Sequence, residues 1–239
     1  MGGSALTPFY DLVHRLSGLG AVHAEMIRMA ELAPGQRVLD IGCGTGNLLL
    51  ALGRDHPGVE IEGLDPDPRP LARAARKAHR AGVAASWRPG YAQDLPHADG
   101  SVDRVFSSLM LHHLRDEGDK EALLAEVRRV LRPDGMLVLA DIDGHTALDG
   151  HGFLRRRMAH NPMIHDNAGM VERITAAGFT VDAPVEHRLR VGRITIVRAH
   201  PGRGPRSRRP ARRGRARGAG CRCRSRCPAR AGPAAAPPC

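Results

Sequence analysis

The sequence has no apolar run long enough to cross a lipid bilayer, for which a helix needs about 20 residues. Residues 1–19 also lack the continuous apolar stretch that a secretory signal requires. These two absences argue against a membrane protein and against an exported one. We therefore expect a cytoplasmic protein with no membrane span.

Acidic and large apolar side chains are absent from residues 201–239, which contain twelve arginines. A segment with so little to bury is expected to be disordered. Without these arginines, 24 basic residues stand against 25 acidic ones, so residues 1–200 have a net charge of −1 although the whole chain has +11. Binding to nucleic acid is therefore conceivable only through this tail. The tail could instead be a solvated appendage, or the product of translating GC-rich DNA past the natural stop.

Cysteine is scarce outside the tail, where four of the five cysteines lie. Their spacing lacks the paired C-x2-C arrangement that is typical of zinc sites, so we predict no metal site. The fifth, Cys43, lies in a glycine-rich loop and has no base beside it in the sequence that could make it a nucleophile. We interpret its side chain as a small buried one.

The residues that are present give their clearest signal at 38–47, which read VLDIGCGTGN. This pattern predicts a buried strand, then a glycine-rich loop, then an apolar helix. Glycines at positions 42, 44 and 46 allow the chain to turn sharply and to approach a ligand where a Cβ atom would clash. The helix that follows offers unpaired backbone N–H groups, so the loop is suited to a small polar ligand.

Two details distinguish this loop from one that binds a dinucleotide. Such loops read G-x-G-x-x-G after an uncharged strand end, whereas here Asn47 stands in place of the third glycine. In addition, Asp40 lies two residues before the first glycine. A negative charge at that place is unfavourable for a pyrophosphate and favourable for a ligand that carries an ammonium or sulfonium group.

Further acids follow the next predicted strands. Residues 59–65 alternate between apolar and acidic side chains and end in Asp65, about twenty residues after the glycine loop. A carboxylate there can accept hydrogen bonds from two vicinal hydroxyls of a ribose, although Asp65 could instead be a turn residue ahead of Pro66. Asp94 lies between predicted strands at 84–88 and 102–106, and by itself could be an ordinary loop acid.

The order of these motifs resembles that of the class I S-adenosylmethionine-dependent methyltransferases, whose first motif is close to V-L-D-x-G-C-G-T-G. The resemblance extends over residues 38–141 and favours the small-molecule type, the methyltransferase-11 group of ubiquinone and menaquinone biosynthesis. It implies S-adenosylmethionine as the cofactor. The residues that match cofactor-binding positions come from several strand ends and are Asp40, Gly42, Cys43, Gly44, Gly46, Asn47, Asp65, Pro66, Asp94, Leu95 and Ser107.

The resemblance also implies how parts of this set are used. In the family an acid at the place of Asp94 meets the adenine amino group, and the apolar residue beside it, here Leu95, packs on the ring. The end of the fourth strand, at Ser107, faces the methionine part of the cofactor. The acceptor would be an unidentified small molecule, methylated by in-line displacement, in which the protein mainly supplies alignment.

Strand and helix patterns alternate along the chain, which predicts an α/β fold. The family implies a Rossmann-like, doubly wound, seven-stranded and mostly parallel sheet with its last strand antiparallel and helices on both faces. We expect an N-terminal helical cap at 1–35, a cofactor-binding methyltransferase domain at 36–200 and the tail at 201–239. The final hairpin is expected from strands at 181–189 and 193–199, and a turn is expected at 132–135.

Other functions stay open at this point. A methyltransferase that acts on RNA or protein could use the basic tail, but residues 107–110 read SSLM where base-methylating enzymes usually have an Asn/Asp-Pro-Pro-aromatic run. A nicotinamide-dependent oxidoreductase is disfavoured by Asp40, Asp94 and the glycine spacing, and nothing marks a non-catalytic binding module. We assign no catalytic residue, because histidines at the start of a helix, such as His112 and His113, more often pack or cap.

Overall fold

The computed structural model describes residues 17–114, 116–142, 169–189 and 192–202. The chain divides into two compact units, Met1–Gly204 and Pro205–Cys239. The whole second unit lies outside the described residues, and so do most of the arginine-rich tail and the first part of the predicted N-terminal cap. No helix in the described part of the chain is long and apolar enough to cross a membrane.

Within the described residues, eight strands form one sheet in the order β3-β2-β1-β4-β5-β8-β6, with β7 paired to β8. Strands β1 to β5 are parallel, and β8 runs antiparallel to β5, β6 and β7. The predicted Rossmann-like sheet with an antiparallel last strand is thereby confirmed. The strands are Arg37–Ile41 (β1), Glu60–Asp65 (β2), Ser86–Pro89 (β3), Val102–Ser108 (β4), Leu131–Asp141 (β5), Phe179–Val181 (β6), Val185–Leu189 (β7) and Gly192–Pro201 (β8).

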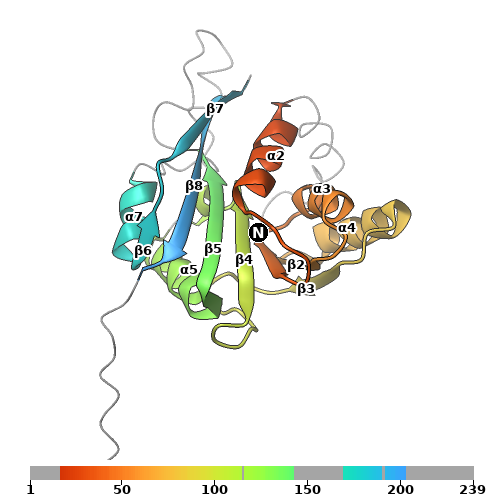
Figure 1. The fold of residues 1–239 in the computed structure, drawn as a ribbon, viewed down its shortest axis with the longest axis horizontal. Coiled ribbons are helices and arrows are strands. Elements are labelled where there is room, and N and C mark those ends of the chain that lie inside the picture. Colours follow the sequence, from red (N-terminus) through yellow and green to blue (C-terminus); the bar gives the residue numbers. More distant parts are fainter. Residues whose placement is uncertain (1–16, 115, 143–168, 190–191, 203–239) are drawn as a thin grey trace, which may run out of the picture. The chain divides into compact units, whose positions relative to one another are not determined.

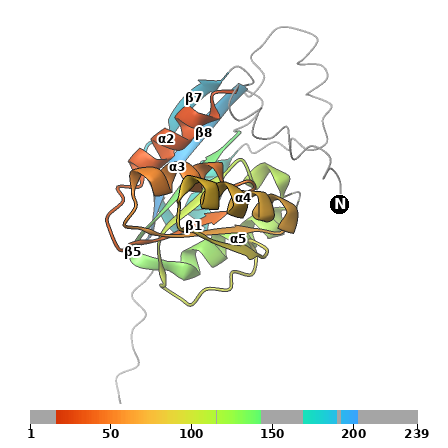
Figure 2. The same ribbon diagram turned by 90° about the vertical axis from the view of Figure 1, so that its right-hand side faces the viewer.

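Helices cover both faces of this sheet (Figure 1). One buried apolar cluster joins α2, α3 and α4 to one face, and a second joins α5 and α7 to the other (Figure 2). Helix α2 therefore contributes Val22 and Met26 to the same core as the rest of the domain. The helices are Leu19–Met29 (α2), Asn47–Asp55 (α3), Pro68–Ala81 (α4), Glu117–Val130 (α5) and Met170–Ala176 (α7), and Leu111–His113 forms a short 3-10 helix (η2).

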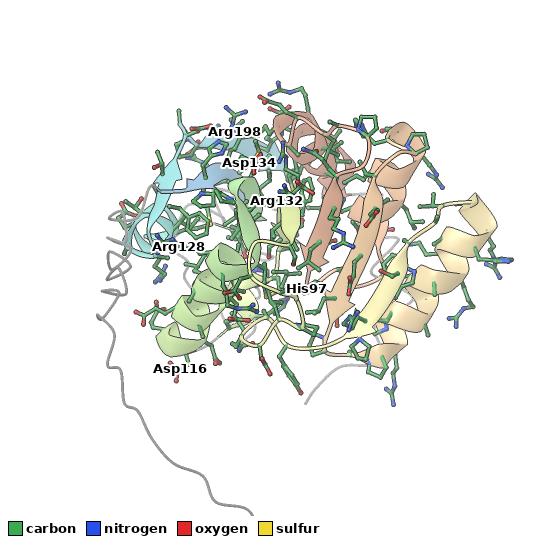
Figure 3. The ribbon with its side chains drawn as sticks, turned by 60° about the horizontal axis from the view of Figure 1, so that its bottom comes forward. His97, Asp116, Arg128, Arg132, Asp134 and Arg198 are labelled. Atoms are coloured by element: carbon green, nitrogen blue, oxygen red, sulfur yellow. The ribbon has the colours of Figure 1, made fainter. Side chains whose placement is uncertain are left out.

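The predicted strand at 181–189 is broken into β6 and β7. Pro184 lies in the break and has no N–H to donate to a neighbouring strand. Asp182 binds β8 through both its backbone N–H, which donates to the Arg198 carbonyl at 2.9 Å, and its carboxylate, which accepts from the Arg198 guanidinium. Figure 3 shows Arg198 among the side chains of this region. The sheet therefore has one strand more than we expected.

The predicted turn at 132–135 lies inside β5 rather than before it. Leu131 pairs with Val102 and Met136 pairs with Arg104, so the four residues between them bulge out of the ladder. Arg132 lies 3.4 Å from Asp103 and 3.8 Å from Asp134 at this bulge (Figure 3). The four turn residues therefore form a bulge inside β5, and they do not separate α5 from the strand as we had expected.

The core under α5 offers a test of this packing. Leu124 is almost completely buried between α5 and the sheet. Leu124→Ala should lower the free energy of unfolding by about 2–5 kcal/mol, because it removes buried methyl groups and leaves a cavity. Urea unfolding followed by circular dichroism measures the change. Glu121→Ala, on the exposed side of the same helix, is the control and should change stability by about 0.5 kcal/mol at most.

Candidate cofactor site

The glycine loop between β1 and α3 is fastened to the end of β2. The backbone N–H groups of Gly42 and Cys43 both donate to the carbonyl of Leu64, at 2.8 and 3.1 Å. Gly46, which directly precedes the first residue of α3, has a φ of 75°. A side chain at position 46 would clash with the ring of Trp87. The glycine pattern of the sequence therefore produces the sharp turn that we predicted.

Asp65, at the end of β2, closes the loop from the other side. One carboxylate oxygen accepts a hydrogen bond from the Gly44 N–H at 2.9 Å, and the other accepts from the Asp67 N–H at 2.9 Å. Burial raises the pKa of the Asp65 carboxyl, and these two hydrogen bonds oppose that effect. Each oxygen still has a lone pair for a further donor, because an ionised carboxylate can accept about four hydrogen bonds.

Asp40 is buried beneath the loop with 2% of its surface exposed. Its Oδ1 has no hydrogen-bond partner among the described residues. Burial raises the pKa of Asp40 well above its ordinary value, and the nearby charge of Asp65 raises it further. A buried carboxylate of this kind is costly unless a positive charge or a donor joins it.

Two further observations fit a polar ligand above β1. The Oγ of Ser107, at the end of the neighbouring strand β4, is also buried and has no partner within the described residues. A Cβ atom added at Gly44 would meet nothing within 4 Å, so the chain leaves open space at the middle of the loop. Within the described residues, two buried oxygens near the ends of β1 and β4 thus lack partners and the loop leaves open space at Gly44, which fits a site for a cationic, hydroxyl-bearing cofactor.

The side chains of three other predicted residues show no direct sign of binding a cofactor. The Asn47 side chain is bound to the loop itself, since its amide donates to Thr45 at 3.3 Å and its Oδ1 accepts from Lys77. Cys43 is a buried free thiol, and burial raises its pKa, which agrees with an unreactive packing role. Pro66 is exposed directly after Asp65.

Asp94 and Leu95 behave differently from each other. Asp94 is exposed, and no hydrogen bond joins its side chain to the glycine loop within the described residues. Leu95 is 3% exposed and belongs to the core on the α5 side of the sheet. Its N–H donates to Glu126 at 2.8 Å and its carbonyl accepts from Arg129 at 2.9 Å, so α5 holds this residue.

Two features of this edge of the sheet were not predicted from the sequence. Tyr91 follows β3 and Gly90, and with 68% exposure it is an exposed large apolar side chain in the described part of the chain. The Gly90 N–H donates to the Asp65 carbonyl at 3.2 Å, which places Tyr91 next to the end of β2. The second feature is Asp141, the acid at the end of β5, which binds His112. An acid at a strand end is the same signal that identified Asp65.

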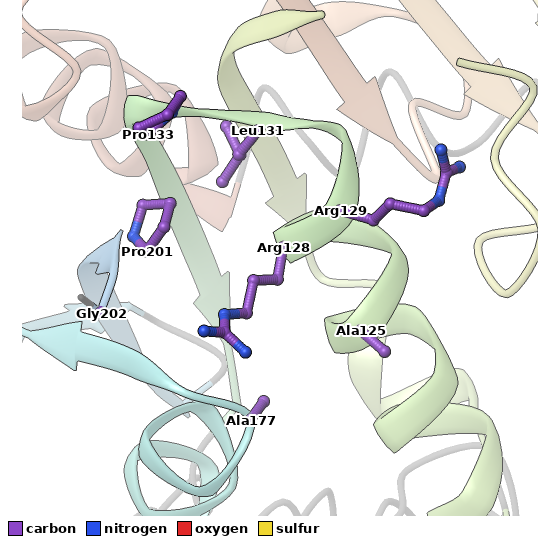
Figure 4. A pocket seen from close by; sticks show the side chains of 8 residues that line it. All are labelled: Ala125, Arg128, Arg129, Leu131, Pro133, Ala177, Pro201 and Gly202. Carbon is purple, nitrogen blue, oxygen red and sulfur yellow. The ribbon is translucent and has the colours of Figure 1, made fainter. Parts of the chain in front are cut away.

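A separate shallow pocket lies at the opposite edge of the sheet (Figure 4). It is lined by Arg128 of α5, Leu131 at the start of β5, Ala177 after α7 and Pro201 at the end of β8. Ligands of open α/β sheets bind at the carboxyl ends of the parallel strands, whereas this pocket lies where β5 starts. Within the described residues, no group of three or more His, Cys, Asp or Glu side chains is arranged to hold a metal ion.

Comparison with known proteins shows which proteins this domain resembles. Residues 38–135 match the family model described as a methyltransferase domain. The chain is 38% identical over 141 residues to a demethylmenaquinone methyltransferase of Thermus thermophilus. The aligned region covers 58% of this chain and 63% of that relative. It spans less than two thirds of the length of the first curated relatives that it matches.

Solved structures agree on the fold. The chain superimposes on an S-adenosylmethionine-dependent methyltransferase from Aquifex aeolicus with a TM-score of 0.64 at 20% identity, covering 84% of this chain and 100% of that one. It also superimposes on the [4+2]-cyclase SpnF with a TM-score of 0.65 at 19% identity, covering 77% and 82%. Likeness at this identity shows the fold alone, and the cyclase illustrates that the fold does not fix the reaction.

These observations together define a Rossmann-like domain that is similar to the class I methyltransferases. Residues 38–135 match a methyltransferase domain, and the predicted resemblance to the class I S-adenosylmethionine-dependent methyltransferases is confirmed. S-adenosylmethionine is the cofactor of that family. Neither the nicotinamide alternative nor nucleic-acid binding through the tail gains support from the comparisons.

The burial of Asp40 predicts an unusual pH dependence for the unliganded protein. Because the pKa of Asp40 is raised in the folded state, the folded chain binds this proton more tightly than the unfolded chain, where aspartate titrates near about 3.9. Stability therefore falls as pH rises from that value through the folded pKa, and the loss is complete above it. Asp40→Asn removes this loss, so the variant should melt at a higher temperature than the wild type at neutral pH.

Thermal unfolding by circular dichroism from about pH 4 to about pH 8 measures this difference, which should vanish toward the acidic end. Glu60→Gln, an exposed acid on β2, is the control and should give a small difference without this trend. Equal melting temperatures of Asp40→Asn and wild type at neutral pH would show that the buried charge has no cost.

Proposed function

We propose that the protein transfers a methyl group from S-adenosylmethionine to a small-molecule acceptor by in-line displacement. The observation that carries this proposal is the carboxylate of Asp40, which is buried beneath the glycine loop and whose Oδ1 has no hydrogen-bond partner in the described part of the chain, within a match to a methyltransferase domain. Such a carboxylate lacks a cation, and this cofactor brings an ammonium and a sulfonium group. The proposal covers the whole protein, whereas the family match covers residues 38–135.

We propose the following roles for the residues around the loop. Asp40 faces the cationic methionine part of the cofactor, which Ser107 also approaches. Asp65 accepts hydrogen bonds from the ribose hydroxyls, with Pro66 beside it, and the backbone of 42–47 lines the space between them. The two hydrogen bonds that Asp65 already accepts support this role, because they fix the orientation of its carboxylate.

The adenine ring needs an apolar surface, and we propose a different one from Leu95, which the family resemblance implied. The core position of Leu95 favours a structural role for that side chain. Tyr91 is exposed, lies beside the end of β2 and offers an aromatic face, so we propose that it packs on the adenine ring. Asp94 is three residues further on, and its N–H donates to the Tyr91 carbonyl, so it keeps the proposed role at the adenine amino group.

When bound, the cofactor supplies a methyl group on a positively charged sulfur. The protein then has to align the acceptor with that methyl group and to keep water out. A small-molecule acceptor is supported by the similarity to a relative named for demethylmenaquinone. A cytoplasmic location is also part of this proposal.

The role of Asp65 can be tested by ligand binding alone. Asp65→Ala should weaken the binding of S-adenosylhomocysteine about 10- to 150-fold, which corresponds to about 1.5–3 kcal/mol for hydrogen bonds to a charged group. Isothermal titration calorimetry measures the affinity. Glu60→Ala, on the same strand but at its other end, should leave it unchanged. Unchanged affinity of Asp65→Ala would remove Asp65 from the site, and a wild type that does not bind would refute the proposed function.

The role of Tyr91 needs a pair of substitutions. Tyr91→Ala should weaken S-adenosylhomocysteine binding about 5- to 150-fold, since stacking of a base on an aromatic ring contributes about 1–3 kcal/mol. Tyr91→Phe keeps the ring without the hydroxyl and should bind like the wild type. A loss in both variants would point to the hydroxyl instead, and no loss in either would place the adenine elsewhere.

A further inference from the structure

A buried histidine and a buried aspartate meet where β4 and β5 end. Nδ1 of His112 lies 2.6 Å from Oδ1 of Asp141, which is completely enclosed. The backbone N–H groups of His112 and Ile142 also donate to this carboxylate, at 3.1 and 2.7 Å. Three donors satisfy the carboxylate as an anion in spite of its burial.

These contacts decide which nitrogen of His112 carries the proton. An ionised carboxylate can only accept hydrogen bonds, so Nδ1 of the ring is the donor in its contact with Asp141. The neutral ring then has its proton on Nδ1 and a free electron pair on Nε2. An aspartate that holds a histidine in this way prepares it to accept a proton from a third group.

The pair lies beside the proposed cofactor site. Strand β4 is the neighbour of β1, and Met110, two residues before His112, packs so closely on Gly42 that a Cβ atom there would lie 2.3 Å from its Cγ. Leu109 has a φ of 54°, which is uncommon for leucine, at the bend that leads from β4 to His112. Backbone strain of this kind gathers at functional sites.

A purely structural role for His112 and Asp141 would explain only part of their contacts. If Asp141 only capped η2, its hydrogen bond to the backbone N–H of His112 would be sufficient. The additional bond to the ring fixes a tautomer and an orientation, which a packing histidine does not need. The neighbouring His113 is exposed and its ring centroid lies 4.1 Å from that of His112.

We propose that His112 is the base that removes a proton from the methyl acceptor, that Asp141 is its positioning residue, and that the acceptor group is a phenol or enol hydroxyl. This inference rests on the proposed function, since it takes the methyl donor to lie above β1. It adds to that function both the class of acceptor and a catalytic residue.

The proposed step balances as follows. The O–H proton of the acceptor goes to Nε2 of His112, and the oxygen uses its electron pair to form the new bond to the methyl carbon. The bond between that carbon and the cofactor sulfur breaks, and its electron pair remains on sulfur. The products are a methyl ether, a neutral thioether and a protonated His112, which Asp141 stabilises until the proton passes to water.

A hydroxyl of this class both needs such a base and is acidic enough for an imidazole to remove its proton. A carboxylate is already ionised at neutral pH, so it has no proton to lose. An amine can lose one proton to water before it binds and the other after the transfer. A phenol is a weak nucleophile until its proton leaves, and its pKa, near about 10, is within reach of imidazole.

Nuclear magnetic resonance tests the state of the ring without any acceptor. Protein labelled with 15N-histidine is compared with His112→Gln in order to assign the signals, and long-range 1H–15N spectra show which nitrogen is protonated. We expect the neutral His112 ring to carry its proton on Nδ1. A ring with its proton on Nε2 overturns the proposal.

Turnover of two acceptors that differ in acidity tests the chemistry. With catechol, His112→Gln should lower kcat by about 100-fold or more and Asp141→Asn by at least about 10-fold. With 4-nitrocatechol, which is far more acidic, the loss in both variants should be much smaller, because the hydroxyl needs less help. A merely structural defect would lower both rates equally, and that result overturns the proposal.

Controls separate this inference from the proposed function. His113→Gln should keep wild-type turnover, and a loss there instead of in His112→Gln overturns the proposal. S-adenosylhomocysteine affinity by calorimetry should be retained in His112→Gln. If the wild type binds this ligand but methylates neither catechol, only the present inference fails, whereas a wild type that does not bind it refutes the proposed function as well.

Discussion

A carboxylate without a partner in the middle of the sheet is the constraint on which the rest of this structure depends. Asp40 lies between apolar residues of β1, and its Oδ1 makes no hydrogen bond within the described residues. A buried charge in that state costs free energy, so folding alone would favour a neutral side chain there. The apolar clusters on both faces of the sheet supply the stability that tolerates it. The domain is thus less stable when empty than it could be, in a way that a cationic ligand would correct.

Three acids, one inside β1 and two at the ends of β2 and β5, show how the same residue type acquires different properties. Asp40 has an unpartnered oxygen, Asp65 accepts hydrogen bonds from two backbone N–H groups, and Asp141 accepts from two backbone N–H groups and a histidine ring. The number of donors decides what each can still do. The first is suited to a cation and the second to further hydroxyl donors. The third is completely buried and already accepts three hydrogen bonds, so its contact with His112 is the route by which it can influence a ligand.

The geometry of the candidate cofactor site could be predicted from the sequence because its determinants are local. The glycines, the acid before them and Asp65 follow one another along two consecutive strands, so their spacing alone places them together. The position of Leu95 could not be predicted, since a leucine after a loop acid looks the same whether it faces a ligand or the core; its hydrogen bond to Glu126 decides. The contact between His112 and Asp141 spans 29 residues and exists only because β4 and β5 are neighbours.

The contrast between the local glycine loop and the contact of His112 with Asp141, which are distant in sequence, also concerns which residues determine the reaction. A fold shared with a [4+2]-cyclase cannot by itself specify methyl transfer, so the side chains beyond the glycine loop must do so. The family match ends at residue 135, before Asp141, and therefore includes the histidine but not the acid that orients it. A change at position 141 would leave the loop between β1 and α3 intact. In the proposed scheme Asp40 and Asp65 lie on β1 and β2, whereas the contact between His112 and Asp141 joins the ends of β4 and β5, so the two acids of the cofactor site and this pair can vary independently.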